Sequence, residues 1–139
     1  MFKEFLVMSW EHPSNPIVTN FEEFKEKFET FLMVAGYRTE ILPTTGRYKG
    51  LIEQGAIVNL TNFDTIAFIS TVETARFVGK MMNQTSLLVR YQDKNGVISI
   101  ADGGLLSTGN KYEVIPAEIT NPDKDYTQYA DTKFHLELS

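Results

Sequence analysis

The residue types best suited to chemistry in this sequence are gathered between Gly46 and Glu53. The segment reads Gly-Arg-Tyr-Lys-Gly-Leu-Ile-Glu. Its arginine and lysine could hold an anion together with the backbone N–H groups of a glycine-bounded turn, and Glu53 could accept a proton or pair with Lys49. It is not a phosphate loop of the nucleotide-hydrolase kind, because the Gly-Lys-Ser/Thr ending and the following helix are missing. The same residues also fit a solvated turn with a surface ion pair.

A second candidate lies at Asn83-Gln84, where a helix is expected to meet a strand. Asn83 suits the left-handed residue that ends a helix. The amide of Gln84 has donors and an acceptor, so it could either fix loops together or read the polar edge of a ligand. The glycine, serine and threonine residues in the segment 102–110 could form an anion nest, but their types favour a hairpin connection.

Composition excludes several kinds of site. The chain of 139 residues has no cysteine and two histidines, His12 and His135. Disulfides, thiolate zinc sites and cysteine nucleophiles are therefore excluded, and neither a metal nor a cofactor is expected. No Ser/His/Asp spacing and no Gly-x-Ser-x-Gly elbow is present.

The formal net charge and the hydropathy pattern narrow the partners further. A net charge of -5 without a basic aromatic stripe does not favour nucleic acid. No apolar run approaches the roughly 20 residues of a membrane span. We expect a single globular domain over residues 1–139, in the cytoplasm and without a membrane partner.

The first part of the chain predicts a strand followed by a helix. Large apolar residues fill 2–10, and prolines follow them. Asn20 can cap a helix with Glu23 completing a capping box, phenylalanines recur at helical spacing, and Gly36 supplies the stop.

The later pattern predicts a second helix among strands. The helix begins at Thr71, capped by Ser70, and an Asn95-Gly96 turn joins two hairpin strands. The segment 44–50 is turn-like. The expected strands occupy 37–42, 51–60, 86–91, 97–100, 111–115 and 134–138. The fold class is α+β, a largely antiparallel sheet of five to seven strands packed with two main helices.

The order of these features resembles a family of small bacterial and phage proteins classed as a domain of unknown function. The order runs from His-Pro-x-x-Asn-Pro at 12–16, through Gly46, Gly50 and Glu53, to Asn-Gln-Thr-Ser-Leu-Leu at 83–88. The resemblance covers roughly residues 5 to 105. It implies that Glu53 and Gln84 share one neighbourhood, whereas Gln54-Gly55 departs from the serine that related sequences place after the glutamate.

We therefore expect a phage-encoded binding protein that contacts a host protein or a small anionic ligand. The expected binding residues are Arg47, Tyr48, Lys49, Glu53 and Gln84. The alternative is an enzyme acting on a phosphorylated or nucleotide-like small molecule, with Glu53 as base and Arg47, Lys49 and Gln84 holding the substrate. A third reading is a protein that self-assembles through apolar surface as a homo-oligomer.

Overall fold

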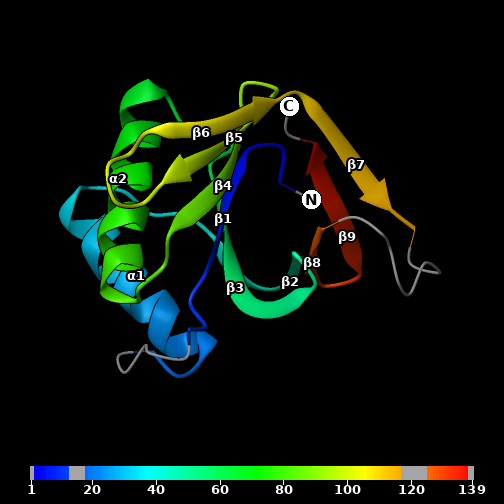
Figure 1. Cartoon of the computed structure of the whole chain (residues 1–139). Coiled ribbons are helices and arrows are strands. Elements are labelled where there is room, and N and C mark those ends of the chain that lie inside the picture. Colours follow the sequence, from blue (N-terminus) through cyan, green and yellow to red (C-terminus); the bar gives the residue numbers. More distant parts are fainter. Residues whose placement is uncertain (1, 13–17, 117–124, 138–139) are drawn as a thin grey trace.

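The protein is a two-helix layer packed on one strongly curled sheet of nine strands, as a computed structural model describes it for residues 2–12, 18–116 and 125–137 (Figure 1). The helices are α1 (Phe21–Val34) and α2 (Thr65–Met81). The strands are β1 (Phe5–Ser9), β2 (Ile41–Tyr48), β3 (Leu51–Asn59), β4 (Ser86–Tyr91), β5 (Lys94–Ser99), β6 (Leu105–Gly109), β7 (Lys111–Ile115), β8 (Tyr126–Tyr129) and β9 (Thr132–Glu137).

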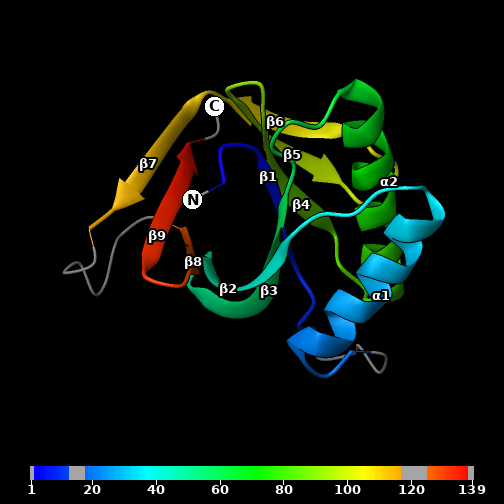
Figure 2. The same ribbon diagram turned by 180° about the vertical axis from the view of Figure 1, so that it is seen from behind.

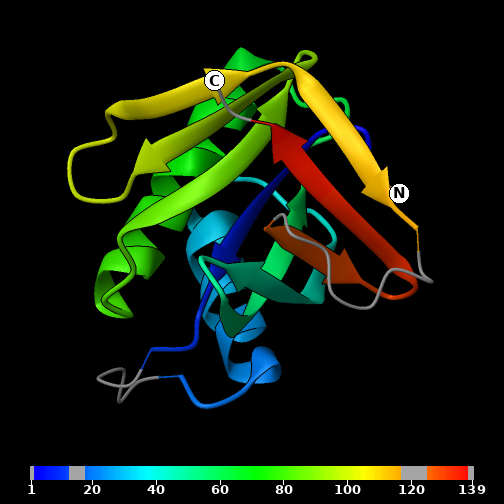
Figure 3. The same cartoon turned by 45° about the vertical axis from the view of Figure 1, so that its right-hand side comes forward.

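The sheet nearly closes on itself. Its strand order is β6-β5-β4-β1-β3-β2-β8-β9-β7, and every described ladder is antiparallel. The two end strands, β6 and β7, are separated in the chain only by Asn110. One continuous stretch of chain therefore forms both ends of the sheet and runs across its upper rim in Figure 3.

Two separate cores follow from the alternation of side chains along the central strands. Leu6, Met8 and Trp10 of β1 and its continuation point toward the helices, which cover this face of the sheet (Figure 2). Phe5 and Val7 point the other way, into the concave side. The second core consists of Phe5, Val7, Ile57, Phe134 and Leu136. We call the side of the sheet that carries this second core its inner face.

Helix α1 confirms the predicted start. The side chain of Asn20 accepts a 2.9 Å hydrogen bond from the backbone N–H of Glu23, and the Glu23 carboxylate accepts one from the Asn20 amide. Phe24, Phe28 and Leu32 are buried on one face. The spacing of the phenylalanines therefore reports core packing, as amphipathic helices require.

Helix α2 begins six residues before the predicted position. Asp64, not Ser70, is its N-cap, and the Asp64 carboxylate accepts a 2.8 Å bond from the N–H of Ala67. The Ser70–Glu73 pair fits the capping pattern but lies inside the helix. The apolar run 66–69 therefore belongs to the first turns of α2. This run is too short for its periodicity to distinguish a strand from a helix.

The expected count of five to seven strands is wrong, because two segments interpreted as a hairpin connection or left unassigned form additional strands, and a third segment, interpreted as a turn, lengthens β2. The segment 44–50 largely belongs to β2, 105–109 is β6, and 126–129 is β8. Pro43 suggested the end of a strand, yet β2 continues through it. β8 pairs only with Thr45, Gly46 and Arg47 of β2. On the side of β8, β2 is therefore an edge strand at Pro43. The missing N–H of Pro43 leaves no hydrogen bond of the ladder unmade on that side.

The β4–β5 hairpin exists, but its turn is not the predicted Asn95-Gly96. The strands pair through Tyr91 and Lys94, and the turn residues Gln92 and Asp93 have φ of 53° and 61°. Positive φ at both central positions is the requirement of a type I′ turn. Asn95 is therefore a residue of β5, and its side chain is buried.

Candidate functional site

Four of the five residues expected to bind lie on the β2–β3 hairpin. The strands pair through Tyr48 and Leu51, and the turn consists of Lys49 and Gly50, with φ of 53° and 81°. A two-residue turn with positive φ at both positions matches the twist of the flanking strands. The glycine thus permits a tight hairpin tip in place of the open loop that the sequence suggested.

Strand alternation places these residues on opposite faces of the hairpin. Ile57 belongs to the second core, so Glu53, four residues earlier in β3, shares the inner face. Glu53 is paired with Gly46, so Tyr48 lies on the same face, while Arg47, paired with Ile52, lies on the outer face. Arg47 and Glu53 therefore point to opposite sides of the sheet.

Tyr48 anchors the hairpin tip to β8. Its hydroxyl is 2.7 Å from the Oγ1 of Thr127, and its ring occupies the space where a Cβ on Gly46 would stand. Burial raises the pKa of Tyr48 to about 12, with the hydrogen bond to Thr127 acting in the opposite direction. The phenol stays neutral and engaged inside the protein, which is the role of an anchor.

Glu53 and Gln84 both form hydrogen bonds to the segment that contains the end of β1 and the residues after it. Ser9 Oγ donates a 2.6 Å hydrogen bond to Glu53 Oε2, and Gln84 Nε2 donates one of 3.3 Å to the carbonyl oxygen of Glu11. Because β1 lies between β3 and β4, the two side chains approach this segment from opposite neighbours. Asn83 has the left-handed φ of 59° expected of a residue that ends a helix.

On the outer face, residues that are distant from Arg47 in the sequence lie beside it. Arg47 is the direct partner of Tyr126 in the β2–β8 ladder. Lys133 Nζ lies 5.0 Å from the centroid of the Tyr126 ring, a cation–π distance. We call Arg47, Tyr126 and Lys133 the Arg47 face; it combines two cationic side chains with one aromatic ring, and Lys49 follows at the adjoining hairpin tip.

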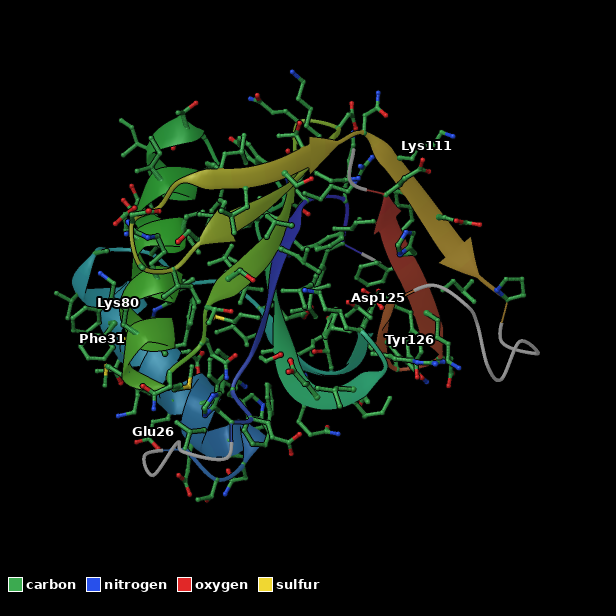
Figure 4. The ribbon with its side chains drawn as sticks, in the orientation of Figure 1. Glu26, Phe31, Lys80, Lys111, Asp125 and Tyr126 are labelled. Atoms are coloured by element: carbon green, nitrogen blue, oxygen red, sulfur yellow. The ribbon has the colours of Figure 1, made fainter. Side chains whose placement is uncertain are left out.

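A carboxylate already binds part of the hairpin tip. Asp125 Oδ1 accepts a 2.9 Å hydrogen bond from the backbone N–H of Lys49, and the carbonyl oxygen of Asp125 is 2.7 Å from His135 Nδ1. The turn therefore does offer an N–H to an anion, as the sequence suggested, but the anion comes from this chain. Figure 4 shows Asp125 and Tyr126 beside β8 and β9, on the side of the molecule away from α1 and α2.

The cavity behind the hairpin tip is too small for an organic ligand. It has a volume of about 80 Å³ and is lined by residues that include Tyr48, Leu88, Thr127 and Phe134. Ligand pockets are several times larger, from about 300 Å³ upward. A ligand of the hairpin region would therefore bind on the outer face, not inside the curled sheet.

The described residues hold no group of three or more His, Asp or Glu side chains that could bind a metal ion. Across 2–12, 18–116 and 125–137, no helix has both the length and the apolar character needed to cross a membrane.

Comparisons with known proteins give little beyond this geometry. No family model and no curated protein matches the chain, so the resemblance to a family of unknown function stays a prediction. A solved structure of a phage SAM lyase in complex with S-methyl-5'-thioadenosine is similar to the chain with a TM-score of 0.42 and 14% identity, over 78% of this chain and 89% of that chain. Similarity at this level assigns neither a fold family nor a function.

Proposed function

We propose that this chain is a binding protein that takes a small anionic ligand on the Arg47 face. The observation that carries the proposal is the direct pairing of Arg47 with Tyr126, with the Lys133 ammonium 5.0 Å from the same ring. Tyr126 and Lys133, which are 79 and 86 positions downstream of Arg47, therefore lie beside the basic segment that the sequence singled out.

The chemistry of the Arg47 face suits a phosphate or carboxylate attached to a planar group. A guanidinium forms paired hydrogen bonds with such oxyanions, and a lysine adds a compact charge. The Tyr126 ring offers a flat surface on which a planar part of the ligand can lie. Arg47 and Lys133, with Lys49 of the adjoining hairpin tip, carry three positive charges against the one carboxylate of Asp125, so these four residues have a net charge of +2 despite the acidic balance of the whole chain.

A binding role fits the arrangement of the site better than the enzyme alternative. That alternative needs Glu53, Arg47, Lys49 and Gln84 to converge on one reacting group. Arg47 and Glu53 instead lie on opposite faces of the hairpin, and Gln84 lies beyond β1. We therefore place the ligand on the outer face and assign Glu53 to holding Ser9.

Isothermal titration of the full chain with inorganic phosphate, adenosine monophosphate and adenosine tests the proposal. We expect the monophosphate to bind more tightly than phosphate and adenosine to bind least. Arg47→Gln and Lys133→Gln should each weaken the binding of the monophosphate by about tenfold, the loss of one charge-assisted contact. Asp125→Asn should strengthen it severalfold, because it removes the competing negative charge.

Lys94→Gln is the matched control, since it removes the same charge from an exposed lysine on β5. It should leave the affinity unchanged. A wild-type chain that binds neither phosphate nor the monophosphate, as a host-protein partner would predict, contradicts the proposal. So does an equal loss of affinity in Lys94→Gln.

A further inference from the structure

The tip of the β2–β3 hairpin already binds an anion that belongs to its own chain. Asp125 Oδ1 accepts a 2.9 Å hydrogen bond from the backbone N–H of Lys49. The two turn residues, Lys49 and Gly50, have φ of 53° and 81°. Backbone N–H groups in such turns form concave sites for anions. The carboxylate of Asp125 therefore marks a position at which the tip accepts negative charge.

The contact between Asp125 and the tip is open to solvent. Asp125 and Lys49 are both exposed, and electrostatic contacts at exposed positions are weak. The backbone of Asp125 is held separately, because its carbonyl oxygen is 2.7 Å from His135 Nδ1. The side chain of Asp125 can therefore leave the tip while its backbone, and with it the neighbouring Tyr126, stays in place.

The tip adjoins the Arg47 face on two sides of the contact. Lys49 follows Arg47 by two residues, a step of at most about 7 Å at 3.4 Å of rise per residue. Asp125 immediately precedes Tyr126, the direct partner of Arg47 in the β2–β8 ladder. Asp125 and Tyr126 both lie on the side of the molecule away from the helices (Figure 4). An anionic group beside the one held by Arg47 would thus reach the position that Asp125 occupies.

A phosphate suits the tip better than the carboxylate that binds there. A terminal phosphate carries a charge of about −1.5 to −2 at pH 7 and has three acceptor oxygens. It can accept hydrogen bonds from the backbone N–H and from the ammonium of Lys49 at the same time. A single phosphate held by Arg47 and Lys133 leaves the contact of Asp125 intact, whereas a second, adjacent phosphate competes for it.

We propose that the preferred ligand carries two adjacent phosphates, as a nucleoside diphosphate does, and that its terminal phosphate replaces the Asp125 carboxylate at the N–H of Lys49. This inference rests on the proposed function, because the first phosphate is the one that binds the Arg47 face. Asp125 is then an internal competitor, which a monophosphate leaves in place and a diphosphate displaces. Lys49 selects for the second phosphate.

Isothermal titration with adenosine diphosphate, adenosine monophosphate and adenosine 3',5'-bisphosphate tests this inference. The diphosphate and the bisphosphate have the same number of phosphates, but only the diphosphate has them adjacent. We expect the diphosphate to bind about tenfold more tightly than the monophosphate, the gain of one charge-assisted contact, and more tightly than the bisphosphate. Equal affinities for the diphosphate and the bisphosphate would mean that total charge alone decides binding, which overturns the inference.

Two variants separate the second phosphate from the first. Lys49→Gln should weaken the binding of the diphosphate about tenfold and that of the monophosphate only about twofold, because only the second phosphate contacts the tip. Asp125→Asn should strengthen the diphosphate about tenfold, more than the monophosphate, because the displaced group no longer carries a charge. Lys94→Gln is again the matched control, and it should change neither affinity.

The amide resonance of Lys49 reports directly which acceptor its N–H has. In isotope-labelled protein, the diphosphate should shift this resonance strongly and the monophosphate only slightly. An amide that the diphosphate does not shift, or equal losses of the two ligands in Lys49→Gln, overturns the inference, while binding of the monophosphate by Arg47 still supports the proposed function. If neither the monophosphate nor the diphosphate binds, the proposed function fails and the inference fails with it.

Discussion

Asn95 in β5 donates a 2.6 Å hydrogen bond from its side-chain amide to the carbonyl oxygen of Lys111 in β7, and this contact joins the neighbour of one end strand of the curled sheet to the other end strand. The same amide lies 3.3 Å from the carbonyl oxygen of Glu137 in β9, and its oxygen accepts a 2.6 Å bond from Arg90. Asn95 is 2% exposed. A buried amide with three partners closes the sheet at a place where the described strands form no backbone ladder.

Asn95→Ala should destabilise the fold by about 2 to 3 kcal/mol, because it leaves the Arg90 guanidinium and two carbonyl groups without this partner. Urea unfolding measures the change. Lys94→Ala, an exposed neighbour in the same strand, should change the free energy of unfolding by less than about 0.5 kcal/mol. Equal stabilities for the two variants would show that the amide does not hold the sheet closed.

Gly55→Ala should destabilise the protein by about 1 to 3 kcal/mol, because the new Cβ would overlap the backbone carbonyl oxygen of Met8 in the neighbouring strand. Gly96→Ala is the comparison, since the atoms nearest its Cβ would be in side chains, Leu105 Cδ1 at 3.2 Å and Val89 Cγ1 at 3.4 Å, with the backbone oxygen of Ser107 at an ordinary contact distance of 3.7 Å. We expect thermal unfolding to show a clearly larger loss for Gly55→Ala. The reverse order would mean that β1 can shift to make room.

Asp64→Ala should cost about 1 kcal/mol, because it removes the cap of α2. Ser70→Ala should cost less than about 0.5 kcal/mol, because Ser70 lies within the helix. Chemical denaturation of both variants decides between the two helix starts. A larger loss for Ser70→Ala would support the start that the sequence suggested.

Alkaline pH should reveal the buried phenol of Tyr48. Its pKa in the folded protein is about 12, above the ordinary value of 10, because burial disfavours the phenolate. The contribution to stability is therefore complete below pH 10 and is lost as the pH rises through about 12, with a size of order 2 kcal/mol. Tyr48→Phe should flatten this decline in urea unfolding, leaving the share of Tyr112, whose pKa burial also raises to about 12. An unchanged decline would contradict the assignment.

Local patterns in the sequence were sufficient where the interaction itself is local. The capping box of Asn20 and Glu23 and the apolar spacing of α1 involve residues within a few turns of one helix, so they were predicted correctly. The antiparallel character of the sheet followed from short alternating segments. The absence of cysteine excluded thiol chemistry without any reference to structure.

The number of strands and the faces of the candidate site were decided by tertiary structure. The positive φ values of Lys49 and Gly50 close a tight hairpin, and a one-residue step along a strand then places Arg47 and Tyr48 on opposite faces. Pairing between β2 and β8 brings Tyr126 to Arg47 across 79 residues of chain. The sequence by itself thus determined which residue types are available, and only the pairing of distant strands decided which of them meet, because cross-strand neighbours are set by register and not by distance along the chain.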